Sequence, residues 1–216
     1  MSTLSQYSYI AIEGNIGAGK TSLSTKLADD FSGQLVLEEF ADNPFLPKFY
    51  EHPERFAFPL ELSFLAERFS QLKNVLLQRN LFRQLVVADY FIDKSLIFAR
   101  NNLHEDEFEL FIKTFNLIRP NLPNPELLVY LYLPVELLLD NIRKRGRPYE
   151  QSIAPDYLLG IQKQYFAFLS RQKSMKILII ETADLDFVNN PDDYRLMVEI
   201  MAQPMKKGLH QISPKG

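Results

Sequence analysis

Residues 14–21 read Gly-Asn-Ile-Gly-Ala-Gly-Lys-Thr and match the pattern G-x-x-x-x-G-K-[ST]. Glycines let successive backbone N–H groups converge on phosphate oxygens, and a helix that starts there adds partial positive charge. Three of the eight glycines of the chain lie in this segment, so a glycine-rich turn without a ligand is the weaker interpretation. The segment predicts a site for ATP, in which Lys20 reaches the β- and γ-phosphates and the Thr21 hydroxyl binds Mg²⁺. The residues expected to hold the triphosphate are Gly14, Asn15, Ile16, Gly17, Ala18, Gly19, Lys20 and Thr21.

A second group of candidate phosphate ligands lies at residues 143–148, which read Arg-Lys-Arg-Gly-Arg-Pro. Positive charge is favoured at the C-terminus of a helix by the helix dipole, and this effect accounts for one or two of the four cations. The alternative is a short basic lid that closes over the transferring phosphoryl group, neutralises its charge and excludes water. Four cations within five residues, bounded by glycine and proline, favour the lid.

Carboxylates end two of the predicted strands. Glu38 and Glu39 end one strand and Asp89 ends another, and ligands bind at the carboxyl ends of parallel strands. One glutamate can orient or deprotonate an acceptor hydroxyl, whereas the other is expected to be a solvated strand end. Asp89 suits Mg²⁺, either directly or through water, and a structural helix cap is the rival interpretation.

Strand and helix patterns alternate along the chain, which predicts a parallel sheet covered on both faces. The strands are expected at residues 7–13, 34–38, 85–89, 127–133 and 176–180. The helices are expected at residues 20–31, 54–80, near 95, 105–118, from 135 into the basic segment, 156–171 and from about 191. The fold class is therefore α/β, a P-loop NTPase-type three-layer sandwich with a five-stranded parallel sheet and a short basic lid.

Composition sets the limits of this interpretation. The 216 residues, 46% of them hydrophobic, suit a single domain, which is expected at residues 1–203, with a flexible tail at 204–216. A net charge of −3 gives no sign of a nucleic-acid partner or a membrane surface. The chain has no cysteine and no pattern typical of a secretory signal, so a cytoplasmic protein is expected. The long helix from Glu54 carries more apolar positions than one sheet face needs, which predicts a homodimer interface.

Four segments together resemble the deoxyribonucleoside kinases, the family of deoxycytidine, deoxyguanosine and deoxyadenosine kinases. They are residues 12–21, the Tyr50-Glu51-His52-Pro53-Glu54-Arg55 segment, Arg145-Gly146-Arg147 with Glu150-Gln151, and Asp184-Leu185-Asp186-Phe187. The resemblance runs from about residue 8 to residue 200, with the segments in the family's order. It implies transfer of the ATP γ-phosphoryl group to the 5′-hydroxyl of a deoxyribonucleoside, with Mg²⁺ as cofactor.

The resemblance also implies roles for individual residues. Glu38 would be the general base, Arg145 and Arg147 would clamp the phosphates, and Lys20 completes the expected catalytic set. Further residues would contact the two substrates: Tyr50 and Glu150 the sugar 3′-hydroxyl, Glu61, Arg68 and Asp93 the nucleobase, and Asp184, Asp186 and Phe187 the ATP adenine. Thr21 and Asp89 are the expected metal ligands.

Three departures from the family pattern affect these expectations. Glu61 stands where the family has a glutamine at the base, and Asn141 stands where it has an upstream lid arginine. The family's acidic-Arg-Ser triplet after the third strand aligns with Asp89-Tyr90-Phe91, so another cation, for which Lys94 is the candidate, would have to lie beside Glu38. A carboxylate only accepts hydrogen bonds, and guanine offers two adjacent donors, so Glu61 favours a purine deoxynucleoside.

Two other functions remain open at this point. A nucleoside monophosphate kinase shares the phosphate loop and the lid, but Glu38 would repel the phosphate of its acceptor. A non-catalytic nucleotide-binding regulator would need no acceptor site. A GTPase is disfavoured because the chain contains no N-K-x-D element to read guanine.

Overall fold

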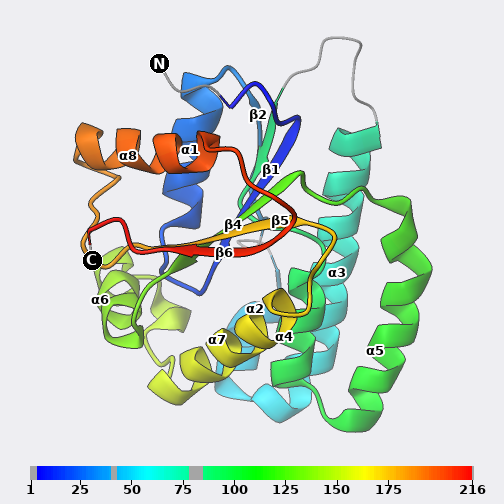
Figure 1. Cartoon of the computed structure of the whole chain (residues 1–216). Helices are drawn as coiled ribbons and strands as arrows, with labels where there is room; N and C mark the ends of the chain where they lie inside the picture. The colour runs from blue at the N-terminus through cyan, green and yellow to red at the C-terminus, as the bar shows by residue number, and fades with distance from the viewer. Residues whose placement is uncertain (1–3, 40–42, 78–84, 216) are drawn as a thin grey trace.

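The computed structural model describes residues 4–39, 43–77 and 85–215. Within these residues, six parallel strands form one sheet in the order β2-β3-β1-β4-β5-β6. The strands are β1 (Tyr9–Gly14), β2 (Gln34–Val36), β3 (Val86–Ala88), β4 (Leu127–Tyr132), β5 (Lys176–Glu181) and β6 (Gly208–Ile212). Helices cover both faces of the sheet (Figure 1), so the three-layer α/β sandwich is confirmed.

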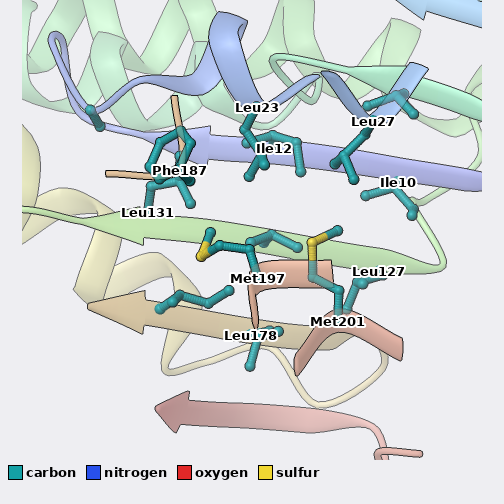
Figure 2. Close-up of a cluster of buried hydrophobic side chains, with 14 of the residues drawn as sticks. Ile10, Ile12, Leu23, Leu27, Leu127, Leu131, Leu178, Phe187, Met197 and Met201 are labelled. Carbon is teal, nitrogen blue, oxygen red and sulfur yellow. The ribbon is translucent and has the colours of Figure 1, made fainter. Parts of the chain in front are cut away.

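The alternation of side chains in β1 divides the core between the two faces, because successive residues of a strand point to opposite sides. Ile10 and Ile12 belong to one buried cluster, which also contains residues of α1 (Lys20–Asp30), α6 (Val135–Arg145) and α8 (Pro191–Ala202). Figure 2 shows strand side chains of this cluster meeting Leu23 and Leu27 of α1.

Tyr9 and Ala11 of β1 point to the other cluster. It contains residues of α3 (Pro53–Leu77), α4 (Lys94–Asn102), α5 (Glu105–Ile118) and α7 (Pro155–Leu169). A third, smaller cluster joins α2 (Leu46–Glu51) to the first half of α3. Because this cluster is separate from the two clusters on the sheet faces, α2 and the first half of α3 can enclose a site.

The five predicted strands are present, with ends that differ by a few residues. The predicted helix at 54–80 is α3, which the structure describes to Leu77, and residues 78–80 lie outside the described residues. The short helix α2 has no counterpart in the prediction.

The prediction of five strands and a flexible tail at 204–216 is corrected by β6. Gly208–Ile212 pair with β5 in parallel, from Lys176 opposite Gly208 to Ile180 opposite Ile212. The hydrophobic pattern does not reveal this strand, because it lies at the sheet edge and none of its residues is fully buried. Backbone hydrogen bonds to β5 hold it in place.

Candidate active site

The phosphate loop connects the end of β1 to the start of α1. Gly17 and Gly19 both have φ of +86°, in the left-handed region that glycine adopts without strain. A Cβ atom on Gly17 would lie 2.8 Å from the carbonyl oxygen of Leu138, and one on Gly19 would lie 2.9 Å from the Phe187 ring. Neither position has room for a side chain, so the packing of α6 and of Phe187 requires glycine at both.

Asn15 fixes the loop to the rest of the protein. Its buried side chain donates from Nδ2 to the carbonyl of Leu158 in α7 at 2.8 Å and accepts from the N–H of Ile16 at 2.9 Å. Asn141, at the expected place of a lid arginine, donates from Nδ2 to the carbonyl of Gly17 at 2.9 Å. The amide therefore joins α6 to the phosphate loop by a neutral hydrogen bond.

Lys20 is the cation of the loop, and its Nζ donates to the carbonyl of Asn15 at 2.9 Å. Burial and the neighbouring Lys94 ammonium lower the pKa of Lys20 to about 8, against the opposing effect of nearby carboxylates. The site therefore holds two ammonium groups close enough to repel each other, which favours an anionic ligand between them.

Asp89 links the phosphate loop to Glu38. Its Oδ2 accepts from the Thr21 hydroxyl at 2.7 Å, and its Oδ1 accepts from the backbone N–H of Glu38 at 2.8 Å. A hydroxyl and a carboxylate next to the phosphate loop are the oxygen donors that Mg²⁺ takes when phosphate oxygens and water complete its shell. Among the described residues there is no group of three or more His, Cys, Asp or Glu that could hold a metal by itself. The residues present therefore fit a metal ion that arrives with a nucleotide.

Glu38 lies just after β2, between two buried cations. Its Oε1 is 2.6 Å from Nη2 of Arg68, and its Oε2 is 2.6 Å from Nζ of Lys94. Burial by itself would raise the pKa of Glu38, but Lys94 and Arg68 outweigh it and hold that pKa at about 2. The carboxylate is therefore ionised and fixed in position at neutral pH.

The cation expected beside Glu38 in place of a family arginine is Lys94, as predicted from the sequence. Lys94 is the first residue of α4 and is buried, as is the next residue, Ser95. Ser95 accepts from Nη1 of Arg68 at 2.8 Å, so the segment also holds the second cation.

Asp93 lies outside the cavity wall, and its carboxylate accepts from Nε of Arg119 at 2.9 Å. Its expected contact with a nucleobase stays a prediction.

A cavity with about 740 Å³ of empty space, part of it open to solvent, lies between the phosphate loop, α2, α3, α4 and α7. The structure brings these sequence-predicted residues to its wall: Ile16, Lys20, Thr21, Glu38, Tyr50, Glu61, Arg68, Asp89, Arg145, Arg147 and Glu150. Arg68 lies there, but its guanidinium is already bound to Glu38 and Ser95.

Glu61 has the most unusual environment in this wall. It is 1% exposed, and its Oε1 accepts from Nδ2 of Asn102 at 2.7 Å. Its Oε2 is buried and has no hydrogen-bond partner among the described residues. Burial raises the pKa of Glu61 to about 7, although Arg68 and the Asn102 hydrogen bond oppose that shift. A buried oxygen without a partner costs free energy, which a ligand in the cavity can recover.

The lid arginines are paired with Glu150 in this structure. Arg147 Nη1 lies 3.2 Å from Glu150 Oε1, and Arg145 donates from Nε to Oε2 at 3.1 Å and also contacts it through Nη2. Glu150 is 5% exposed. Gly146, with φ of +72°, ends α6 and turns the chain between the two arginines.

The segment predicted to contact the ATP adenine lies beside the phosphate loop but outside the cavity wall. Phe187 is buried against Gly19, and the Asp186 carboxylate accepts from the N–H of Asn189 at 3.0 Å. The N–H of Asp186 donates to Asp193 of α8 at 2.8 Å. Asp184 is exposed. The adenine role of this segment stays a prediction.

Sequence reasoning missed part of the cavity wall. Lys94, the candidate cation beside Glu38, also lines the cavity. The missed residues of the wall are Leu46, Phe49, Leu60, Phe64, Phe98, Asn102 and Tyr157.

No helix in the described ranges combines the length and apolar character needed to cross a bilayer.

Comparison with known proteins gives consistent results. A family model described as "Deoxynucleoside kinase" matches residues 10–205. A deoxyguanosine kinase of Bacillus subtilis (strain 168) is 36% identical over 190 residues, which cover 86% of this chain and 92% of the relative. A deoxyadenosine/deoxycytidine kinase of the same organism is 28% identical over 199 residues, which cover 90% of this chain and 92% of the relative. The solved structure of a deoxyadenosine kinase from M. mycoides with bound dATP superimposes with a TM-score of 0.77 at 22% identity, covering 90% of this chain and 99% of that one, which supports the fold.

Proposed function

The chain belongs to the deoxynucleoside kinase family and phosphorylates a deoxyribonucleoside with ATP, and from this premise we propose that deoxyguanosine is its preferred acceptor. The observation that carries the proposal is the unpartnered Oε2 of Glu61 in the cavity wall. An ionised carboxylate only accepts hydrogen bonds, and guanine presents its N1–H and its 2-amino group side by side on one edge. The 36% identical deoxyguanosine kinase supports the same choice.

The residues around the cavity suit the two substrates as follows. The phosphate loop and Lys20 hold the triphosphate by backbone N–H groups and one ammonium. Thr21 and Asp89 would hold Mg²⁺, which neutralises charge on the phosphate oxygens when it is bound. Tyr50, which stacks on Tyr149 with ring centroids 6.1 Å apart, and Glu150 both line the cavity and would contact the sugar.

Glu38 positions the 5′-hydroxyl. Phosphoryl transfer passes through a loose transition state that needs orientation and charge neutralisation more than a strong base. A carboxylate with a pKa of about 2 is a weak base, but it accepts a hydrogen bond in a fixed direction because Arg68 and Lys94 hold both of its oxygens. Arg145 and Arg147 would leave Glu150 in part to bind the transferring phosphoryl group.

The other candidate functions are weaker. A monophosphate acceptor would bring its phosphate towards the carboxylates of Glu38 and Asp89. The homodimer through α3 stays a prediction, which sedimentation of the purified protein would test. The cytoplasmic location also stays a prediction.

The test is the initial rate of phosphorylation of the four deoxynucleosides by Mg-ATP, for the wild type and for Glu38→Gln. We expect transfer to deoxyguanosine first, slowed by roughly a hundredfold in the variant because the amide donates as well as accepts. Glu39→Gln is the matched control, since Glu39 is the neighbouring, exposed carboxylate. Absence of transfer to every deoxynucleoside would refute the proposal, and an active Glu38→Gln would remove Glu38 from the mechanism.

A further inference from the structure

We propose that the protonation state of Glu61 selects the purine: the ionised carboxylate accepts deoxyguanosine, and the protonated carboxyl accepts deoxyadenosine. The inference rests on the proposed function and concerns the base that the same site reads. It predicts one enzyme with two acceptors whose ratio depends on pH.

The geometry around Glu61 leaves Oε2 and the second lone pair of Oε1 for the ligand. Asn102 donates from Nδ2 to Oε1 at 2.7 Å and to the Tyr157 hydroxyl at 3.3 Å, so both hydrogens of this amide are engaged on one side of the carboxylate. Oε2 is buried without a partner among the described residues, and Glu61 lines the cavity. Oε2 is therefore the acceptor that Glu61 can offer to a polar group of a ligand in the cavity.

The two forms of this carboxyl group present different patterns to a base. When ionised, it offers only acceptors, which match the N1–H and 2-amino donors of guanine. When it is protonated, the proton resides on Oε2, because Oε1 already accepts from Asn102. The Oε2–H group then donates to N1 of adenine, and Oε1 accepts from the 6-amino group. Each base thus makes two hydrogen bonds with one form and meets a mismatch in the other.

The surroundings keep the proton exchangeable near neutral pH. Burial raises the pKa of Glu61 to about 7, and the nearby charge of Glu38 adds to this rise. The rise is opposed by Arg68 of α3 and by Asn102 and Lys94 of α4. Tyr157 of α7 and Tyr50 of α2 also face Glu61, and burial raises the pKa of both hydroxyls, so they stay protonated. The pKa of Arg68 is raised and that of Glu38 is about 2, so these two charges are constant while Glu61 titrates.

The experiment is a competition between deoxyguanosine and deoxyadenosine at equal concentration in one reaction with Mg-ATP. The two monophosphate products are measured at early times from roughly pH 5.5 to 8, below the pH at which the N1–H of guanine ionises. Their ratio equals the ratio of the two kcat/KM values, so pH effects on ATP, Lys20 or the lid act on both products and cancel. We expect the ratio of dGMP to dAMP to rise by about tenfold or more across this range.

Glu61→Gln supplies the decisive comparison. The amide keeps a donor and an acceptor at every pH, so we expect a ratio that favours adenine and changes by less than about twofold. Glu67→Gln is the control, because Glu67 lies on the same helix, bound to Ser63, and does not line the cavity. It should keep the rise of the wild type.

The outcomes separate this inference from the proposed function. Formation of both products at a constant ratio in the wild type overturns the inference and leaves the kinase. An equal rise in Glu61→Gln also overturns it, since another group would then be titrating. Absence of both products at every pH overturns the proposed function, and the inference with it. If Glu61→Gln does not fold, the wild-type profile alone decides.

Discussion

The chemistry of the site depends on a few buried charges that neutralise one another. Glu38 contacts Arg68 and Lys94. Glu13, fully buried behind the phosphate loop, accepts from the Tyr165 hydroxyl at 2.7 Å and from the N–H of Phe91 at 3.0 Å. Burial raises the pKa of Glu13, with Lys94 and Lys20 opposing it. Lys94 therefore acts on two carboxylates at once.

Replacing Lys94 with methionine tests this dependence. Lys94 is the largest influence that lowers the pKa of Glu38, so its loss raises that pKa and moves the acid limb of the kcat/KM profile to higher pH. The acid limb moves to higher pH because a carboxylate with a depressed pKa stays ionised until the pH falls to that pKa. In the variant the pKa of Glu38 is higher, so the ionised form is lost at a higher pH. We expect a loss of about tenfold or more at neutral pH. The pH–rate profiles of Lys94→Met and Lys94→Arg are compared, and the arginine variant should restore the profile. An unchanged acid limb in Lys94→Met would refute the role.

Residues in a contiguous motif could be predicted from the sequence, and isolated ones could not. The phosphate loop, Glu38 and Asp89 were found because each follows a recognisable strand. Asn102 was missed, because a single polar side chain on a helix gives no sign of the direction in which it points.

At the scale of elements, the site is held together by helices that meet at the phosphate loop. Helix α6 contacts it through Leu138, Ile142 and Asn141, and α7 contacts it through Leu158. The same α6 carries Arg145 at its end. A displacement of α6 would therefore affect the loop and the lid together.

A pair of glycine substitutions separates packing from backbone strain. Gly17 and Gly146 have similar positive φ values, but only Gly17 is crowded, by the Leu138 carbonyl at 2.8 Å, whereas nothing lies within 4 Å of a Cβ on Gly146. Gly146→Ala should cost about 1 kcal/mol in the free energy of unfolding, from backbone strain alone. Gly17→Ala should cost more and lower kcat/KM for ATP by roughly a hundredfold. Urea unfolding and ATP kinetics of the two variants are the measurements, and equal effects would refute the packing argument.

Elements with a clear hydrophobic period were predicted well, and those held by other forces were not. Helix α3 and strands β1 to β5 have apolar faces that the core requires. Helix α2 is only six residues long, and β6 is held by backbone pairing at an edge, so neither gives a pattern that distinguishes it from a loop.

At the scale of the whole molecule, the last strand completes one side of the sheet. Beyond β6, Lys215 forms an ion pair with Asp193 of α8 at 2.7 Å. Asp193 in turn accepts from the N–H of Asp186, beside the phosphate loop. The end of the chain is thus connected to the predicted adenine segment.

A chain that ends at residue 206 would expose the unpaired edge of β5. An unprotected edge strand pairs with other molecules, so we expect aggregation and a fall in Tm of roughly 5 °C or more. Thermal unfolding followed by circular dichroism and light scattering measures both effects. A chain that ends at residue 213 keeps β6 and should remain monodisperse. An unaltered Tm in the shorter chain would show that β6 adds nothing to stability.

The unpartnered oxygen of Glu61 also has a consequence for folding thermodynamics. Its pKa rises from 4.5 to about 7 in the native state, so between these values the folded protein binds more protons than the unfolded chain. Stability is therefore retained at low pH and falls as the pH rises through that window, by on the order of 2–3 kcal/mol. Urea unfolding should show this fall between about pH 5 and pH 8 in the wild type and not in Glu61→Gln, and parallel curves would contradict it. The group proposed to read the base is thus a point where the empty enzyme gives up stability. A nucleoside that binds Oε2 would restore that stability, so we expect acceptor binding and resistance to unfolding to rise together.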